Sequence, residues 1–262
     1  MSKLQALIFD VDGTLADTER DGHRVAFNRA FAEAGLDWEW SVERYGELLA
    51  VTGGKERIQQ YLTTDYPDFV PPSDRREWIA ALHKAKTAHY TQLIEENVVP
   101  LRPGVKRLLQ EAREAGLRLA IATTTTPANV TALLQTALGS DSLGWFEVIA
   151  AGDMVPAKKP APDIYDYALK AMQLEPHVCL AFEDSHAGLQ SAQQADLATV
   201  ITVNDYTQKQ DFTGAALVVD HLGEPNLPFE VLAGETGGST FFDIKLAQYL
   251  QDLRHSSGAS TA

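Results

Sequence analysis

The chain has 262 residues, 45% of them apolar, so it can form one large domain or a core domain with a smaller insert. Its 22 basic and 36 acidic residues give a formal charge of −14, which argues against nucleic acid and anionic membranes as partners, because both need a basic surface. The acidic surface favours a monomer. It is compatible with an anionic small-molecule substrate, because a few local cations or a metal ion can reverse the charge within one cleft.

The apolar run at residues 4–9 is too short for a membrane span and lacks the layout of a signal peptide. We therefore expect a cytoplasmic protein, or one of the plastid stroma if a transit peptide has been removed. The run ends at Asp10 and predicts a strand that is buried on both faces.

Residues 17–98 have a helical pattern throughout, with one apolar stripe over 27–34 and a further helix predicted at 78–90. We predict that this stretch forms a small helical cap domain inserted after the first strand. Residues 1–16 and 99–262 would then form the core domain.

Beyond residue 99, apolar runs typical of buried strands alternate with helical patterns, and this alternation predicts an α/β fold with a doubly wound parallel sheet. Such a sheet binds its ligands at the carboxyl ends of the strands. Residues 256–262 are expected to be disordered. The predicted strands cover 117–122, 146–150, 178–182 and 198–203, and the predicted helices cover 105–112, 127–134, 164–172, 187–195 and 241–253.

The strongest functional signal is Asp10-Val11-Asp12-Gly13-Thr14, which directly follows the first strand. Two carboxylates this close repel each other, so they need hydrogen bonds or a cation, and Mg²⁺ prefers such oxygen ligands. We interpret Asp10 as a nucleophile that forms an aspartyl-phosphate. Asp12 would give a proton to the leaving oxygen and then take one from water.

Hydroxyl-bearing and basic residues follow the later strands. Thr123, Thr124 and Thr125 precede the helix predicted at 127–134, whose N-terminus favours phosphate. Lys158 and Lys159 stand before a proline, and we expect one of them to offset phosphoryl charge and the other to be solvent-exposed.

An acidic pair, Glu183 and Asp184, follows the strand predicted at 178–182. It is suited to completing a metal site with Asp10 and Asp12, because the carboxyl ends of parallel strands share one edge of the sheet.

As a set, DVDGT, Thr123, Lys159-Pro160 and Glu183-Asp184 resemble the four motifs of the haloacid dehalogenase-like hydrolase superfamily, in the correct order over residues 4–203. The resemblance implies a Rossmann-like core with a helical cap. It also implies Asp10 as the nucleophile, Asp12 as the acid and base, Thr123 as a phosphoryl-binding hydroxyl and Lys159 as the site lysine. The implied Mg²⁺ ligands are Asp10, the Asp12 backbone carbonyl and Asp184, with Glu183 at or just outside that shell.

Four longer stretches, DTERDGHRVAFNRAF, VTGGKERI, ATTTTPANV and GDMVPAKKPAPDIY, resemble the CbbY-type phosphatases. This implies hydrolysis of xylulose-1,5-bisphosphate to xylulose-5-phosphate. A bisphosphate needs cations away from the metal, and the predicted cap offers several. Glu19 and His23 are expected to meet sugar hydroxyls. The rest of the predicted substrate-binding set is Gly53, Gly54, Lys55, Arg57, Lys86, Thr124 and Thr125.

Three alternatives stay open. A mutase resembling β-phosphoglucomutase would share both aspartates but return the phosphoryl group to the sugar. A phosphoglycolate-type monophosphatase would have less use for the cations of the cap. A binding module on the same fold would be expected to lack the nucleophile or the metal-binding acids.

Overall fold

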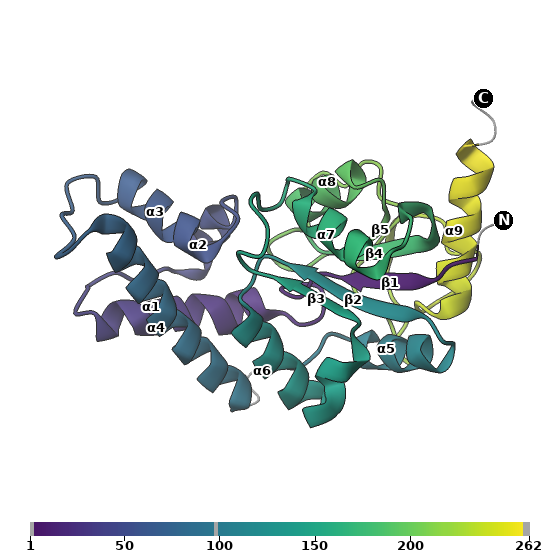
Figure 1. Cartoon of the computed structure of the whole chain (residues 1–262), viewed down its shortest axis with the longest axis horizontal. Helices are drawn as coiled ribbons and strands as arrows, with labels where there is room; N and C mark the ends of the chain where they lie inside the picture. Colours follow the sequence, from purple (N-terminus) through teal and green to yellow (C-terminus); the bar gives the residue numbers. More distant parts are fainter. Residues whose placement is uncertain (1–2, 97–98, 259–262) are drawn as a thin grey trace.

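A seven-stranded sheet forms the centre of the larger part of the molecule in the computed structural model, which describes residues 3–96 and 99–258 (Figure 1). The strand order is β3-β2-β1-β4-β5-β6-β7. All neighbouring pairs are parallel except β6 and β7, which are antiparallel. The strands are β1 (Ala6–Phe9), β2 (Arg118–Thr123), β3 (Val148–Ala151), β4 (Cys179–Glu183), β5 (Ala198–Thr202), β6 (Leu217–Val219) and β7 (Val231–Gly234).

The predicted fold class is confirmed, with β1 to β5 within two residues of the predicted strands at either end. Strands β6 and β7 were not predicted. The first has three residues, and the four residues of β7 are all exposed at the edge of the sheet. The three residues of β6 are all buried but are fewer than the run of about four to eight by which a buried strand is recognised, and β7 has no buried face.

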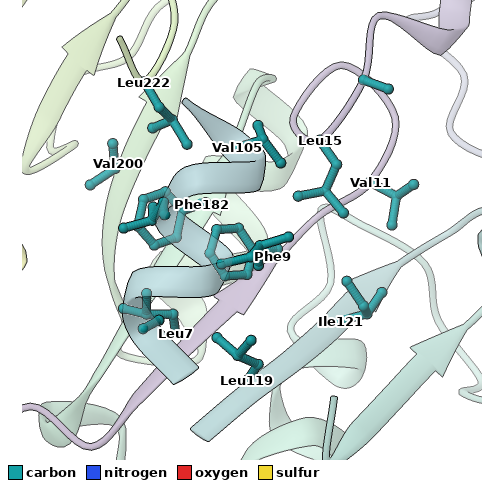
Figure 2. Close-up of a cluster of buried hydrophobic side chains, with 14 of the residues drawn as sticks. Leu7, Phe9, Val11, Leu15, Val105, Leu119, Ile121, Phe182, Val200 and Leu222 are labelled. Carbon is teal, nitrogen blue, oxygen red and sulfur yellow. The ribbon is translucent and has the colours of Figure 1, made fainter. Parts of the chain in front are cut away.

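Helices cover both faces of the sheet. Leu7 and Phe9 face α5 (Val105–Glu114), α6 (Pro127–Leu138) and α9 (Ile244–Gly258), whereas Ala6 and Ile8 face α7 (Asp163–Met172) and α8 (His186–Gln194). Figure 2 shows the first of these clusters, in which Phe9 and Phe182 from neighbouring strands lie together. Burial on both faces explains why the strands are continuous apolar runs. Two short 3-10 helices, η2 (Ser140–Trp145) and η3 (Pro176–Val178), complete the connections.

The inserted segment forms a helical group beside the carboxyl end of the sheet (Figure 1). Its helices are α1 (Arg24–Glu33), α2 (Val42–Leu48), α3 (Gly54–Thr64) and α4 (Arg75–Glu95), preceded by a π-helical turn, η1 (Glu19–His23). They enclose an aromatic-rich cluster of their own, with Phe27, Phe31, Trp40 and Tyr45 fully buried. We call this group the cap.

The division into 17–98 and 1–16 with 99–262 stays a prediction, and its border at residue 98 lies outside the described residues. The second half of α4 packs Tyr90, Leu93 and Ile94 into the core cluster beneath the sheet. The expectation of disorder is wrong for residues 256–258, which belong to α9, and residues 259–262 lie outside the described part. Within residues 3–96 and 99–258, no helix is long and apolar enough to cross a membrane.

Candidate active site

Three carboxylates meet where β1 and β4 end. Asp10 follows β1, and Glu183 and Asp184 stand at the end of β4, which pairs with β1 in parallel register. One oxygen of each carboxylate lies within 4.8 Å of the others. The exposed fractions are 6% for Asp10, 1% for Glu183 and 7% for Asp184. The sequence thus placed these three residues correctly at one edge of the sheet, because each comes directly at a strand end.

Lys159 is the cation of this cluster. Its Nζ donates to Asp10 Oδ1 at 2.6 Å, to Glu183 Oε1 at 2.5 Å and to the Ala122 carbonyl at 2.9 Å. Burial disfavours its charge, but the attraction of Asp10 and Glu183 outweighs this and raises the pKa of Lys159. Tyr165 from α7 donates to the same Glu183 oxygen at 2.5 Å. Lys159, rather than Lys158, therefore contacts the carboxylate proposed as the nucleophile.

The cluster fits a divalent cation. Its three carboxylates outnumber the one ammonium by two when all four groups are ionised. Burial, helped by the charges of Glu183 and Asp12, raises the pKa of Asp10 to about 8 against the pull of Lys159. Burial, Asp10 and Glu183 also raise the pKa of Asp184 well above its ordinary value. An ion with oxygen ligands would offset this repulsion, so the donor set suits Mg²⁺.

Asp12 lies in a separate hydrogen-bond network that reaches into the cap. Its Oδ1 accepts from the Thr18 hydroxyl at 2.5 Å and lies 2.8 Å from His23 Nε2. Lys86 Nζ lies 2.7 Å from His23 Nδ1. An ammonium can only donate, so Nδ1 accepts from Lys86 and the N–H at Nε2 faces Asp12. Burial favours a neutral Asp12, but His23, Thr18 and Lys86 outweigh it and lower the pKa of Asp12.

Two adjoining cavities connect the acidic cluster with the cap. One of about 100 Å³ is lined by Asp10, Thr123, Lys159, Glu183 and Asp184. The other, of about 290 Å³, lies under the cap. The residues that line both cavities are Asp12, Glu19, Gly53, Arg57 and Thr124. The structure therefore brings the predicted residues of core and cap into one continuous cleft.

The far end of this cleft is rich in cations. Lys55, His83, Lys86 and Lys158 line it, together with Gly54 and Thr125. Burial, followed by the nearby charges of Lys86 and Lys55, lowers the pKa of His83 to about 3. Its neutral imidazole leaves the three lysines as the cations of this wall, which also contains the carboxylate of Asp153.

The expectation that one of the two neighbouring lysines, Lys158 and Lys159, is solvent-exposed is wrong. The side chain of Lys158 is 16% exposed and its Nζ donates to both carboxylate oxygens of Glu56 in the cap, at 2.8 and 2.9 Å. It also lies 3.2 Å from Asp153, which is ion-paired with Lys55 of the cap. A loop of the core and the start of α3 thus join through alternating charges, which no spacing within the sequence reveals.

Arg57 and Glu19 are joined through a tyrosine. Arg57 Nη1 donates to the Tyr45 hydroxyl at 2.9 Å, and that hydroxyl in turn donates to Glu19. Arg57 also donates to the carbonyls of Leu48 and Val51. Its guanidinium is therefore largely engaged within the cap, and its clearest role is to orient Tyr45 and, through it, Glu19.

Sequence reasoning missed several residues of the site. Asn204, two residues beyond β5, donates to Asp184 Oδ2 at 2.7 Å, and the rule that found Asp10 and Glu183 could have found it. Thr18, Tyr45 and Tyr165 gave no comparable signal. They stand within or beside helices, and only the fold brings their hydroxyls to Asp12, Glu19 and Glu183.

Gly188 of α8 offers a test of how rigidly the cluster is held. A Cβ at this position would lie 1.9 Å from Glu183 Oε2, and Lys159 and Tyr165 hold that carboxylate in place. We expect Gly188→Ala to destabilise the protein by about 1–3 kcal/mol, the usual cost of overpacking, and to lower activity. Thermal denaturation measures the first effect. Gly144→Ala is the control, because its Cβ would meet nothing within 4 Å. Equal melting temperatures for the two variants would show that the cluster can rearrange.

Comparisons with known proteins show the family of the chain. The family model for haloacid dehalogenase-like hydrolases matches residues 4–196. Protein CbbY of Rhodobacter capsulatus is 54% identical over 81% of this chain and 91% of its own length. The plasmid-encoded CbbY of Cupriavidus necator is 51% identical over 86% and 88%.

A crystal structure of a CbbY variant from Rhodobacter sphaeroides in complex with xylulose-1,5-bisphosphate superposes with a TM-score of 0.79, at 45% identity, over 83% of this chain and 94% of that one. The family match covers well over half of the chain, and the relatives match most of their own length. The chain therefore belongs to the haloacid dehalogenase-like hydrolase family, in which it is a phosphatase related to the CbbY proteins.

Proposed function

We propose that this phosphatase hydrolyses a sugar bisphosphate, xylulose-1,5-bisphosphate, to xylulose-5-phosphate, with Mg²⁺ bound at the acidic cluster. The observation that carries the proposal is the charge distribution along the cleft. One end has the carboxylates of Asp10, Glu183 and Asp184 with Lys159, and the other end has Lys55, Lys86 and Lys158 with the single carboxylate of Asp153 between two of them. A substrate with an anionic group at each end fits this arrangement better than a monophosphate does. The complex of the related CbbY with this bisphosphate supports the same choice.

Asp10, Asp184 and the backbone carbonyl of Asp12 would hold the ion, with Glu183 beside them. When bound, Mg²⁺ supplies positive charge that offsets the repulsion between the carboxylates and the phosphoryl oxygens. Lys159 Nζ holds Asp10 Oδ1, so Oδ2 is the oxygen that we assign to the attack on phosphorus. The Thr123 hydroxyl and the start of α6 would hold the phosphoryl oxygens.

Asp12 is positioned for proton transfer, because Thr18 and His23 both bind its Oδ1 and leave Oδ2 for the leaving oxygen. In the first step Asp12 gives a proton to that oxygen as the P–O bond breaks. In the second step it takes a proton from the water that attacks the aspartyl-phosphate, which releases phosphate and restores Asp10. The lowered pKa of Asp12 suits the second step, and the negative charge of a bound phosphate would raise that pKa for the first.

We expect the gain in melting temperature on adding Mg²⁺ to increase as the pH rises from about 5 to 8. Burial raises the pKa of Asp10 from 3.8 to about 8, so below that pH a proton on Asp10 competes with the ion. Between these two values the folded, metal-free protein holds more protons than the unfolded chain, so its stability falls as the pH rises through this window. Asp10→Asn removes this titration, so the stability of the metal-free variant should fall less over the same window. A Mg²⁺ effect that is independent of pH in the unsubstituted protein would contradict the expectation.

Phosphate release in the presence of Mg²⁺ from a small substrate panel tests the choice of substrate. The panel contains xylulose-1,5-bisphosphate, ribulose-1,5-bisphosphate, phosphoglycolate and β-glucose-1-phosphate. We expect strong preference for the xylulose bisphosphate over its ribulose epimer. Preference for phosphoglycolate would favour the monophosphatase alternative, and an isomeric sugar phosphate without free phosphate would favour the mutase.

A further inference from the structure

Arg102 is a buried arginine that no step of the proposed reaction uses. It lies between the cap and α5 and is 7% exposed. Its Nη1 donates to the carbonyl of Gly13 and, at 3.0 Å, to that of Thr202. Its Nη2 donates to the carbonyls of Val203 at 2.5 Å and Asp220 at 2.6 Å. One guanidinium thus joins the loop after β1 with the carboxyl ends of β5 and β6.

Two of these bonds lead directly to the acidic cluster. Gly13 follows Asp12, and a Cβ on Gly13 would lie 2.1 Å from Asp184 Oδ2, so its backbone is held between Arg102 and Asp184. Val203 precedes Asn204, whose Nδ2 donates to the same Asp184 oxygen at 2.7 Å. Arg102 therefore fixes the two loops that contact Asp184.

Arg102 is also part of the connection to the cap. Its backbone N–H donates to the Leu15 carbonyl at 2.9 Å, and the neighbouring Leu101 forms a bridge with Ala16. Its Nε lies 3.3 Å from the carboxylate of Asp17 at the start of the cap connection. The two chain segments that link core and cap are thus joined at this residue.

The chemistry of the site explains why an arginine stands there. A guanidinium presents five N–H donors in a rigid plane, and here carbonyls and a carboxylate surround it on all sides. A lysine has three donors and could not reach all of these acceptors. Burying a charge is unfavourable unless its hydrogen bonds are satisfied, so space filling alone does not account for it.

We propose that Arg102 is a positioning residue for the metal site. It holds the loop after Asp12 and the loop that carries Asn204, and so keeps Asp184 and the Asp12 backbone in the arrangement that takes up the ion. The inference rests on the proposed function, because it concerns the Mg²⁺ site assigned there.

The test is the dissociation constant of Mg²⁺, measured by isothermal titration calorimetry on the folded protein without substrate. For Arg102→Lys we expect an increase of about 10- to 100-fold, the usual effect of losing a group that orients metal ligands. The matched control is Arg107→Lys in α5. Arg107 also donates to two backbone carbonyls, of Gly223 and Phe242, but it does not contact the acidic cluster. Its variant should bind Mg²⁺ as the unsubstituted protein does, even if both variants melt earlier.

A purely structural role would lower the melting temperature of Arg102→Lys without changing the dissociation constant, and that result would overturn the inference.

Asn204→Ala removes the hydrogen bond from this loop to Asp184 and leaves the contacts of Arg102 in place. We expect it to weaken Mg²⁺ binding as well, and less than additively when combined with Arg102→Lys. Unchanged Mg²⁺ binding in Asn204→Ala would show that this loop does not position Asp184 for the ion, and it would count against the inference even if Arg102→Lys did not fold. Absence of Mg²⁺ binding by the unsubstituted protein would instead reject the metal assignment itself.

Discussion

Asp10→Asn is expected to lower phosphate release by at least about 10⁴-fold, because an amide cannot form the aspartyl-phosphate on which the proposed reaction depends. The variant should keep its fold. The amide has nearly the shape of the carboxylate, Lys159 retains Glu183 as its partner, and one of the mutually repelling charges is gone. The measurement is steady-state phosphate release, with circular dichroism to verify the fold.

Asp166→Asn in α7 is the matched control for this variant, because it makes the same exchange on a carboxylate that does not line the cleft. We expect it to retain full activity. If Asp10→Asn kept a rate within tenfold of the unsubstituted enzyme, the assignment of Asp10 as the nucleophile would be wrong.

Asp12→Asn should lower kcat by about 10²–10⁴-fold, the usual contribution of general acid and base catalysis. Its Mg²⁺ affinity should stay close to that of the unsubstituted enzyme, because only the backbone carbonyl of Asp12 is assigned to the ion. The amide can still accept from Thr18 and His23 on its oxygen, so the geometry around it is retained.

The contrast with Asp184→Asn separates the two roles. That variant removes an assigned ligand from the buried cluster, so we expect its Mg²⁺ affinity to fall at least tenfold. Titration calorimetry with Mg²⁺ and initial rates at saturating Mg²⁺ distinguish the two. A large loss of Mg²⁺ affinity in Asp12→Asn would show that its carboxylate, and not its carbonyl, contacts the ion.

The sequence predicted well which edge of the sheet carries the candidate site, for a physical reason. Each strand of a parallel sheet that is covered on both faces is an apolar run, and the polar residue that ends the run is forced to the common carboxyl edge. Asp10, Thr123 and Glu183 are found by this rule, and the structure places all three beside one cavity. The three-residue strand β6 and the exposed edge strand β7 have no long buried run and escaped the same reasoning.

The wall of the cleft that the cap provides could not be derived in this way. Whether Lys55, Lys158 and Arg57 face the substrate, the solvent or another side chain depends on how the cap sits on the core. In the structure Lys55 and Lys158 pair with Asp153 and Glu56 across that boundary, and Arg57 turns toward Tyr45. The two lysine pairs join residues about 100 positions apart, and helical periodicity carries no information about them.

The most direct test of the central claim is chemical trapping of the acyl-phosphate. Borohydride reduces an aspartyl-phosphate to homoserine, which peptide mass spectrometry locates in the chain. We predict homoserine at position 10 after reduction in the presence of Mg²⁺ and xylulose-1,5-bisphosphate, and none in Asp10→Asn or without substrate. Substrate turnover with no reduced residue at position 10, or with the trapped group at a different carboxylate, would contradict the account.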